Sequence, residues 1–292
     1  MNVTSGRAQL GFASAKHTRS SRAYLTCWGA DVAKHGDIAK GPGWELRCGD
    51  WQQVLADVQC DALITDPPYS QRTATGQRSA STKGSATRTQ QPVAGRIRYG
   101  HITSGDCAAL ARQFAGALWF VVFGDHLTAG WHRAAAEAAG RYVFAPVPWC
   151  KPDAAPRLRG DGPPSAVEWI TASRTRGKDS IAVIRKQPPG YYLLGTMAHR
   201  RAQVVVGGKP APLMRSIVRD YSLPGALVCD PFAGGATTLL AAVMEGRRAI
   251  GAELDPETFE KAVARLSRGY TPDLFAGAPT AKPVQTSLLG GQ

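Results

Sequence analysis

The segment Asp66-Pro67-Pro68-Tyr69 follows Asp61–Thr65, an apolar run that predicts a buried strand. Polar groups just beyond the carboxyl end of a parallel strand lie where α/β sheets bind their ligands. Two successive prolines fix the backbone and carry no N–H, so the Pro67 carbonyl can point outward beside the Asp66 carboxylate. The alternative interpretation is a plain strand-ending turn, because Asp-Pro and Pro-Pro are ordinary turn dipeptides.

Two oxygen acceptors side by side suit an amino group that is conjugated to a heteroaromatic ring. The lone pair of such a nitrogen is delocalised, so the nitrogen is a poor nucleophile. If Asp66 and the Pro67 carbonyl accept its two hydrogens, a pyramidal and more nucleophilic nitrogen is favoured. A nucleobase whose amino group reacts in this way must first leave the base stack of the duplex. The ring of Tyr69 then offers a flat face on which the extruded base stacks. By analogy with single-strand binding, this stacking contributes about 1–3 kcal/mol.

A glycine-rich turn at residues 230–238 (DPFAGGATT) leads into the predicted helix Thr237–Glu245. Glycines let the backbone approach a cofactor closely, and the helix N-terminus supplies unpaired N–H donors. The predicted strand Arg248–Ala252 ends in Glu253, nineteen residues after Gly234. An acidic residue about twenty positions on commonly binds the ribose hydroxyls of a nucleotide-like cofactor. A nicotinamide-dependent oxidoreductase is one alternative, but it leaves residues 66–69 unexplained.

In this order the two motifs resemble those of the amino-group DNA methyltransferases, which carry D-P-P-Y and D-P-F-x-G-x-G-T-T. The order with the catalytic motif first is that of the family's β-type. Three further segments are similar: Cys48-Gly49-Asp50, Trp149-Cys150-Lys151-Pro152 followed by Glu168, and Lys209-Pro210. The resemblance covers roughly residues 44–268.

The resemblance implies methyl transfer from S-adenosylmethionine to adenine N6 of DNA after base flipping, with no metal. Cytosine N4 is the alternative, because both reactions share the motif; Asp rather than Ser before Pro-Pro-Tyr favours adenine. Phe232 is expected near the sulfonium and Lys209 at the carboxylate of the cofactor. The chain departs from the family at Ala236, where a second glycine is usual, and at residues 205–208 (VVGG), in place of H-P-T-Q. The implied catalytic residues are Asp66, Pro67, Pro68 and Tyr69, and the implied cofactor contacts are Asp50, Lys209, Asp230, Phe232, Ala233, Gly234, Gly235, Thr237 and Glu253.

Two residues near the expected site receive supporting roles. His126 follows the strand Leu118–Phe123 at the ligand-binding edge, but the reaction needs no strong base before methyl transfer, so a structural role is favoured. Glu168 is expected to be structural or to orient the catalytic loop.

Short apolar runs alternate with amphipathic segments, which predicts an α/β protein: a Rossmann-like, mostly parallel sheet with helices on both faces. The methyltransferase domain is predicted at residues 23–270, between a flexible arm at 1–22 and a flexible tail at 271–292. The strands are expected at Asp61–Thr65, Leu118–Phe123, Tyr142–Pro146, Ser180–Ile184, Ala226–Cys229 and Arg248–Ala252. The helices are expected at Cys107–Ala115, Ala129–Ala139, Ala211–Tyr221, Thr237–Glu245 and Pro256–Ser267.

The chain is basic, with 35 Lys and Arg against 22 Asp and Glu, a formal charge of +13. A surplus of that size attracts polyanions. Residues 70–105 contain no acidic residue, and a connection of that length is usually functional or disordered. We expect residues 70–105 to contact DNA phosphates and residues 173–205 to form a short target-recognition region; solvated loops are the alternative. The expected DNA-binding side chains are Arg72, Arg78, Lys83, Arg88, Arg96, Arg98, Arg174 and Arg176.

Composition also bears on location and assembly. The six cysteines form no C-x-x-C pair, and no apolar run approaches the roughly 20 residues that span a bilayer. A cytoplasmic protein without metal or membrane contact is therefore expected. Many β-type relatives are dimers, so a homodimer on double-stranded DNA is expected. A catalytically silent DNA-binding regulator and a methyltransferase of RNA or protein stay open as alternatives.

Overall fold

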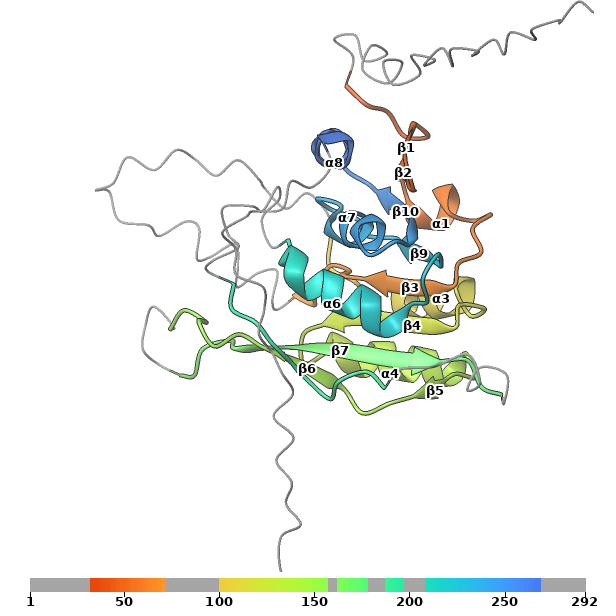
Figure 1. Ribbon diagram of the computed structural model, residues 1–292. Helices are drawn as coiled ribbons and strands as arrows, with labels where there is room; N and C mark the ends of the chain where they lie inside the picture. Colours follow the sequence, from red (N-terminus) through yellow and green to blue (C-terminus); the bar gives the residue numbers. More distant parts are fainter. Residues whose placement is uncertain (1–31, 72–99, 157–161, 178–186, 197–207, 269–292) are drawn as a thin grey trace, which may run out of the picture. The chain divides into compact units, whose positions relative to one another are not determined.

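Five adjacent strands form the parallel centre of one sheet in a computed structural model (Figure 1). Their order is β2 (Trp44–Cys48), β10 (Arg248–Glu253), β9 (Leu227–Asp230), β3 (Ala62–Thr65) and β4 (Trp119–Gly124). All of these elements lie in the unit that begins at Ala33. The structure describes residues 32–71, 100–156, 162–177, 187–196 and 208–268.

Further strands extend this centre on both sides, and the first strand on each side is antiparallel to its central neighbour. At one edge β1 (Ile38–Gly41) pairs with β2. At the other edge β7 (Val167–Arg174) pairs with β4, followed by β6 (Val147–Cys150) and β8 (Tyr192–Leu193), while β5 (Tyr142–Val143) pairs with the end of β7. The Rossmann-like α/β prediction is confirmed, and the sheet is mixed because β1 and β7 pair antiparallel with the central strands β2 and β4. The strand expected at Ser180–Ile184 lies outside the described residues.

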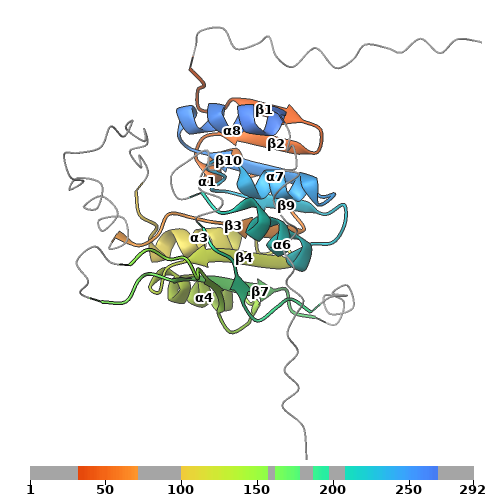
Figure 2. The same ribbon diagram turned by 60° about the vertical axis from the view of Figure 1, so that its left-hand side comes forward.

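Both faces of the sheet are buried at β3, β4, β9 and β10, which explains why these strands are largely continuous apolar runs rather than alternating ones. In β4, Trp119, Val121 and Phe123 pack on one face, and Phe120 and Val122 pack on the other. Figures 1 and 2 show one group of helices on each face of the sheet. The first group is α6 (Ala211–Tyr221), α7 (Thr237–Met244) and α8 (Pro256–Arg268), and the second is α1 (Trp51–Val54), α3 (Ser104–Gln113) and α4 (Thr128–Ala138).

Several helix boundaries follow from local chemistry. Thr103 begins α3 with a capping box, in which its side chain accepts from the Asp106 amide and the Asp106 side chain accepts from the Thr103 amide. Pro210 precedes α6, where a missing N–H costs nothing. No helix in the described ranges is long and apolar enough to cross a membrane.

The chain changes direction across the sheet between β3 and β9. From β9 it passes through α7 to β10 on one side, whereas from β3 it passes through α3 to β4 on the other. The start of this strand pair is fixed by Asp61, whose carboxylate accepts from the Leu227 amide at 2.7 Å. Such a switch point opens a crevice at the carboxyl ends of the two strands, where α/β proteins bind ligands. Both sequence motifs follow these two ends.

Candidate active site

A buried hydrogen bond joins the two motifs. Thr65, the last residue of β3, donates its hydroxyl to Oδ1 of Asp230, the last residue of β9, at 2.5 Å. The same oxygen accepts from the Phe232 amide at 3.1 Å, so Asp230 also fixes the first bend of the glycine-rich turn. Burial raises the pKa of Asp230 to about 6. The two motifs therefore meet in the structure, and Asp230 holds them together.

The glycine-rich turn runs through left-handed backbone. Gly234 has a φ of 52°, and Ala236 has a φ of 56° and a ψ of 34° immediately before α7. Alanine in this conformation costs roughly 1–2 kcal/mol, a penalty that glycine escapes. Ala236 therefore keeps the backbone that the usual glycine would adopt. On the other side of the turn, Arg265 of α8 donates to the Gly235 carbonyl at 2.7 Å and to the Thr237 hydroxyl at 2.8 Å.

Glu253 lies beside this turn at the end of β10 and is 5% exposed. Its Oε2 accepts from the Gly234 amide at 2.9 Å and its Oε1 from the Asp255 amide at 2.9 Å. Burial outweighs these bonds and raises the pKa of Glu253 to about 7. Each carboxylate oxygen keeps a further lone pair, so the side chain can still accept from ribose hydroxyls.

The predicted cofactor residues on β2 come to the same edge. The Gly49 amide donates to the backbone carbonyl of Glu253 at 2.8 Å, which brings Asp50 alongside. Asp50 is the N-cap of α1. The Phe232 ring packs against Trp51 of α1, with centroids 5.8 Å apart. The structure therefore gathers every predicted cofactor residue except Lys209 around the ends of β2, β9 and β10.

The D-P-P-Y motif at residues 66–69 is held by ion pairs that the sequence did not reveal. Lys209 Nζ lies 2.5 Å from Asp66 Oδ2, 3.0 Å from the Tyr69 hydroxyl and 3.2 Å from Glu168 Oε2. The Tyr69 hydroxyl donates to Glu168 Oε2 at 2.5 Å, and Lys151 donates to Glu168 Oε1 at 2.9 Å. The expected orienting role of Glu168 agrees with these contacts. Lys209, expected at the cofactor carboxylate, contacts the carboxylate of Asp66 in the structure.

Charges in this cluster balance, with two carboxylates against two ammonium groups. Burial raises the pKa of Glu168, but the two lysines outweigh it and bring the pKa down to about 2. For Asp66 burial is the larger effect, so its pKa is raised despite the attraction of Lys209. Among the groups that the structure describes, none forms a hydrogen bond with Asp66 Oδ1, although this oxygen is buried. That oxygen is a buried acceptor with a hydrogen bond left to make.

Asp125 binds Ser70, the residue that follows the D-P-P-Y motif. From the sequence, its neighbour His126 was considered, and no role was assigned to Asp125. Its Oδ2 accepts from the amide and hydroxyl of Ser70, at 3.2 and 2.5 Å. Its Oδ1 accepts from the amides of Leu127 and Thr128 at the start of α4. The residue after the D-P-P-Y motif is therefore tied to the neighbouring strand end. Its position directly after β4, at the edge where α/β sheets bind ligands, could have indicated a role for Asp125.

The predicted DNA-binding residues are not gathered at this edge. Arg174 ends β7, which is antiparallel, so it pairs with Trp119 at the opposite end of the sheet from Asp66. Its guanidinium stacks on the Tyr142 ring at 4.7 Å, and Arg176 donates to the Gly140 carbonyl at 3.0 Å. This placement does not support a DNA-binding role for either arginine. The other six, Arg72, Arg78, Lys83, Arg88, Arg96 and Arg98, lie outside the described residues.

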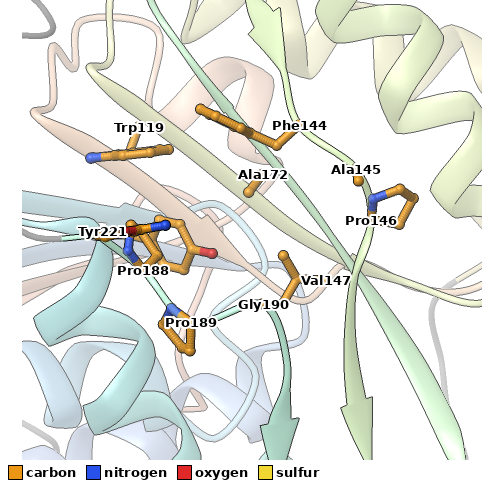
Figure 3. Close-up of a pocket in the computed structure, with 11 residues that line it drawn as sticks. Trp119, Phe144, Ala145, Pro146, Val147, Ala172, Pro188, Pro189, Gly190 and Tyr221 are labelled. Atoms are coloured by element: carbon orange, nitrogen blue, oxygen red, sulfur yellow. The ribbon is translucent and has the colours of Figure 1, made fainter. Parts of the chain in front are cut away.

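A hollow of about 290 Å³ lies away from the motifs (Figure 3). Its walls include Trp119, Phe144, Pro188 and Tyr221. Trp119 is the first residue of β4, whereas the motifs follow the last residues of β3 and β9. None of the residues that line it is a predicted catalytic or cofactor residue, so it is separate from the candidate site.

This architecture is the Rossmann-like fold of S-adenosylmethionine-dependent DNA methyltransferases, and solved structures agree. The complex of M1.HpyAVI with S-adenosylmethionine matches with a TM-score of 0.56 and 21% identity, over 76% of this chain and 98% of that chain. The cytosine-N4-specific PvuII DNA methyltransferase matches with a TM-score of 0.50 and 18% identity, over 82% of this chain and 92% of that chain. At these identities the likeness shows the fold.

Sequence comparison narrows the class. Residues 196–264 match the family model for N6/N4 DNA methylases. DNA adenine methyltransferase YhdJ of Escherichia coli (strain K12) is 41% identical over 58 residues, 20% of each chain. Type II methyltransferase M.Cfr9I of Citrobacter freundii is 30% identical over 140 residues, 45% of this chain and 47% of that protein. The matches thus span less than half of these relatives. The predicted resemblance to the amino-group DNA methyltransferases is confirmed. The predicted cofactor, S-adenosylmethionine, is the molecule bound in the M1.HpyAVI complex.

Proposed function

We propose that this chain methylates the exocyclic amino group of a DNA base, with adenine N6 as the target and S-adenosylmethionine as the methyl donor. The observation that carries the proposal is the meeting of two loops across β3 and β9. One loop presents Asp66 with a buried, unpartnered oxygen, and the other is a glycine-rich turn beside the buried carboxylate of Glu253.

The cofactor residues fit a molecule with a ribose and a charged amino acid end. Glu253 and Asp50 would accept from hydroxyl or amino groups of its nucleoside, and the backbone of residues 232–235 would lie close to it. Phe232 would offer an aromatic ring near the cationic centre. When bound, the cofactor supplies an electrophilic methyl group. The protein's part is to hold that group and the base in line, so positioning carries much of the rate.

The catalytic loop acts on the target nitrogen through hydrogen bonds. Asp66 Oδ1 accepts from one amino hydrogen, and the Pro67 carbonyl accepts from the other. Tyr69 stacks against the extruded base, and its ring is steadied because its hydroxyl donates to Glu168. Asp66 is also the nearest carboxylate to receive the proton that nitrogen loses after methylation. Its raised pKa, which burial causes, favours that acceptance.

The wider organisation belongs to the same proposal. The substrate is duplex DNA, from which the base is flipped, and the basic residues 70–105 contact its phosphates. Residues 23–270 form the methyltransferase domain. Within the expected target-recognition region 173–205, the residues after Arg176 read the target sequence, because Arg174 ends β7 at the other end of the sheet from Asp66. The chain acts as a cytoplasmic homodimer, alone or beside a restriction enzyme, and needs no metal.

Adenine and cytosine differ little at this site, so cytosine N4 is a second candidate. The pair of acceptors at Asp66 and Pro67 serves either amino group. Asp at the first motif position and the similarity to an adenine methyltransferase over 58 residues favour adenine.

Nucleoside mass spectrometry of DNA from methylation-deficient cells that express the chain tests the proposal. An Asp66→Ala variant is the control. N6-methyladenine that disappears in the control is the expected result, whereas N4-methylcytosine would move the target to cytosine. Soluble protein that binds S-adenosylmethionine but leaves no modified base in DNA would refute DNA methylation and favour RNA or protein as the substrate.

A further inference from the structure

Lys209 is buried at the centre of the catalytic cluster, just before α6. Its side chain is 7% exposed, and its ammonium contacts Asp66, Tyr69 and Glu168. Pro210 follows it and is the N-cap residue of α6. A lysine that was merely a surface charge would extend into solvent.

Aromatic rings surround the same ammonium. The rings of Tyr69, Phe123 and Trp149 have their centroids 5.2, 5.1 and 5.9 Å from Lys209 Nζ. Cation–π attraction and two carboxylates together offset the cost of burying the charge. Burial lowers the pKa of Lys209, but the attraction of Asp66 and Glu168 exceeds this effect and raises the pKa above its ordinary value. Lys209 therefore stays charged at neutral pH.

Without the charge of Lys209, the surroundings of Asp66 would disfavour its ionised form. Burial and the neighbouring Glu168 carboxylate both oppose its ionisation. Asp230, joined to the adjacent Thr65, adds a further acidic group nearby. A protonated Asp66 would carry a hydroxyl donor, and it would compete with the amino hydrogens that the proposed reaction needs it to accept.

We propose that Lys209 is a positioning residue for Asp66: its ammonium binds Oδ2, keeps the carboxylate ionised and leaves Oδ1 directed to the target amino group. This inference rests on the proposed function and differs from the role that the family resemblance implies, in which Lys209 pairs with the cofactor carboxylate. Glu168 completes the device, because it binds Lys209 and Tyr69 through one oxygen and Lys151 through the other.

The charge of Lys209 is tested with Lys209→Met, and Lys209→Gln provides a variant that retains hydrogen-bond donors without charge. An opposite charge in close contact shifts a carboxyl pKa by about 1–3 units. The acid limb of the single-turnover methylation rate should therefore move up by about 1–3 pH units in both variants. Lys209→Arg should restore the limb, because it retains the cation. S-adenosylmethionine affinity, measured by calorimetry, should change by less than about twofold, whereas loss of a charge-assisted bond costs roughly tenfold.

Lys151→Met is the matched control, because this lysine binds Glu168 and not Asp66. It should move the acid limb much less than Lys209→Met does. A cofactor affinity that falls about tenfold while the limb stays in place would overturn the proposal and support the cofactor-carboxylate role. A rate that falls equally at every pH would reduce Lys209 to a structural residue.

A second measurement needs no activity, and its first arm uses the wild-type protein. Infrared difference spectra of the whole protein against Asp66→Asn report whether Asp66 is a carboxylate at pH 7. A carboxylate that becomes protonated at higher pH in Lys209→Met is the expected result. A protonated Asp66 in the wild-type protein at pH 7 overturns the inference, even if the variants do not fold. Absence of methylation with an ionised, Lys209-dependent Asp66 would refute the proposed function alone.

Discussion

Replacement of Asp125 by alanine should disturb catalysis more than cofactor binding. This carboxylate, 8% exposed, joins the exit of the catalytic motif at Ser70 to the first turn of α4. The cofactor loops follow β2, β9 and β10, whereas Asp125 follows β4. A change at Asp125 therefore loosens the loop that carries Asp66 and leaves the glycine-rich turn in place.

The size of the effect follows from the bonds that are lost. Ser70 is 2% exposed, and a buried amide deprived of its acceptor costs about 1–3 kcal/mol. Loss of a side-chain acceptor at a helix start costs about 1 kcal/mol more. Asp125→Ala should therefore lower the free energy of unfolding by about 3 kcal/mol. A domain whose free energy of unfolding is about 5–15 kcal/mol stays folded after such a loss. A catalytic group displaced by about 1 Å can lose up to about 100-fold in rate, so we expect kcat to fall about tenfold or more.

Urea unfolding, single-turnover methylation and calorimetric cofactor binding measure these effects together. Thr128→Val is the matched control, since it removes the hydroxyl that contacts Asp125 from the α4 side and spares the Ser70 bonds. It should lose stability with little change in kcat. The reasoning is refuted if Asp125→Ala reduces kcat no more than Thr128→Val does. It is also refuted if Asp125→Ala reduces the affinity for S-adenosylmethionine by as large a factor as it reduces kcat.

Three further outcomes are expected. Because burial raises the pKa of Glu253 to about 7 and ribose hydroxyls favour its ionised form, cofactor binding should release a proton and weaken as the pH falls below that value; calorimetry should show this dependence lost in Glu253→Gln. In Gly251→Ala the new Cβ would lie 2.9 Å from Leu239 Cδ1 and from a backbone oxygen, so urea unfolding should show a loss of about 1–3 kcal/mol. Replacing Arg174 and Arg176 together by alanine should leave the salt dependence of DNA binding unchanged; a shallower slope in a filter-binding titration would show that DNA reaches their end of the sheet.

The parts of the fold that were predictable are those where local pattern and tertiary environment agree. The strands β3, β9 and β10 are apolar runs buried on both faces, and the helix Ala211–Tyr221 was predicted with its observed bounds. By contrast, β2 (WELRC) and β7 (VEWITASR) carry charged residues inside the strand. Their strand conformation depends on neighbours far along the chain, which a local pattern does not contain.

The candidate site shows the same division. Asp66 and Glu253 were predictable because Asp66 opens a recognisable motif and Glu253 lies nineteen residues after Gly234. The partnership of Lys209 with Asp66 spans 143 residues, and no spacing rule predicts it. The position of Arg174 was not predictable for a related reason: its charge is visible in the sequence, but the antiparallel direction of β7, which carries it away from Asp66, is not.

The bond between Thr65 and Asp230 has a consequence for how the protein is made. These residues are 165 positions apart, so β3 waits beside an unfilled position in the sheet until β9 has been synthesised. At about 5–20 residues per second, that wait is roughly ten to thirty seconds. During it, a buried, apolar strand exposes one edge, which is the condition under which nascent chains aggregate or recruit chaperones. Soluble yield in cells should therefore respond to translation speed and chaperone supply, and no truncated product that stops before β9 can complete the site.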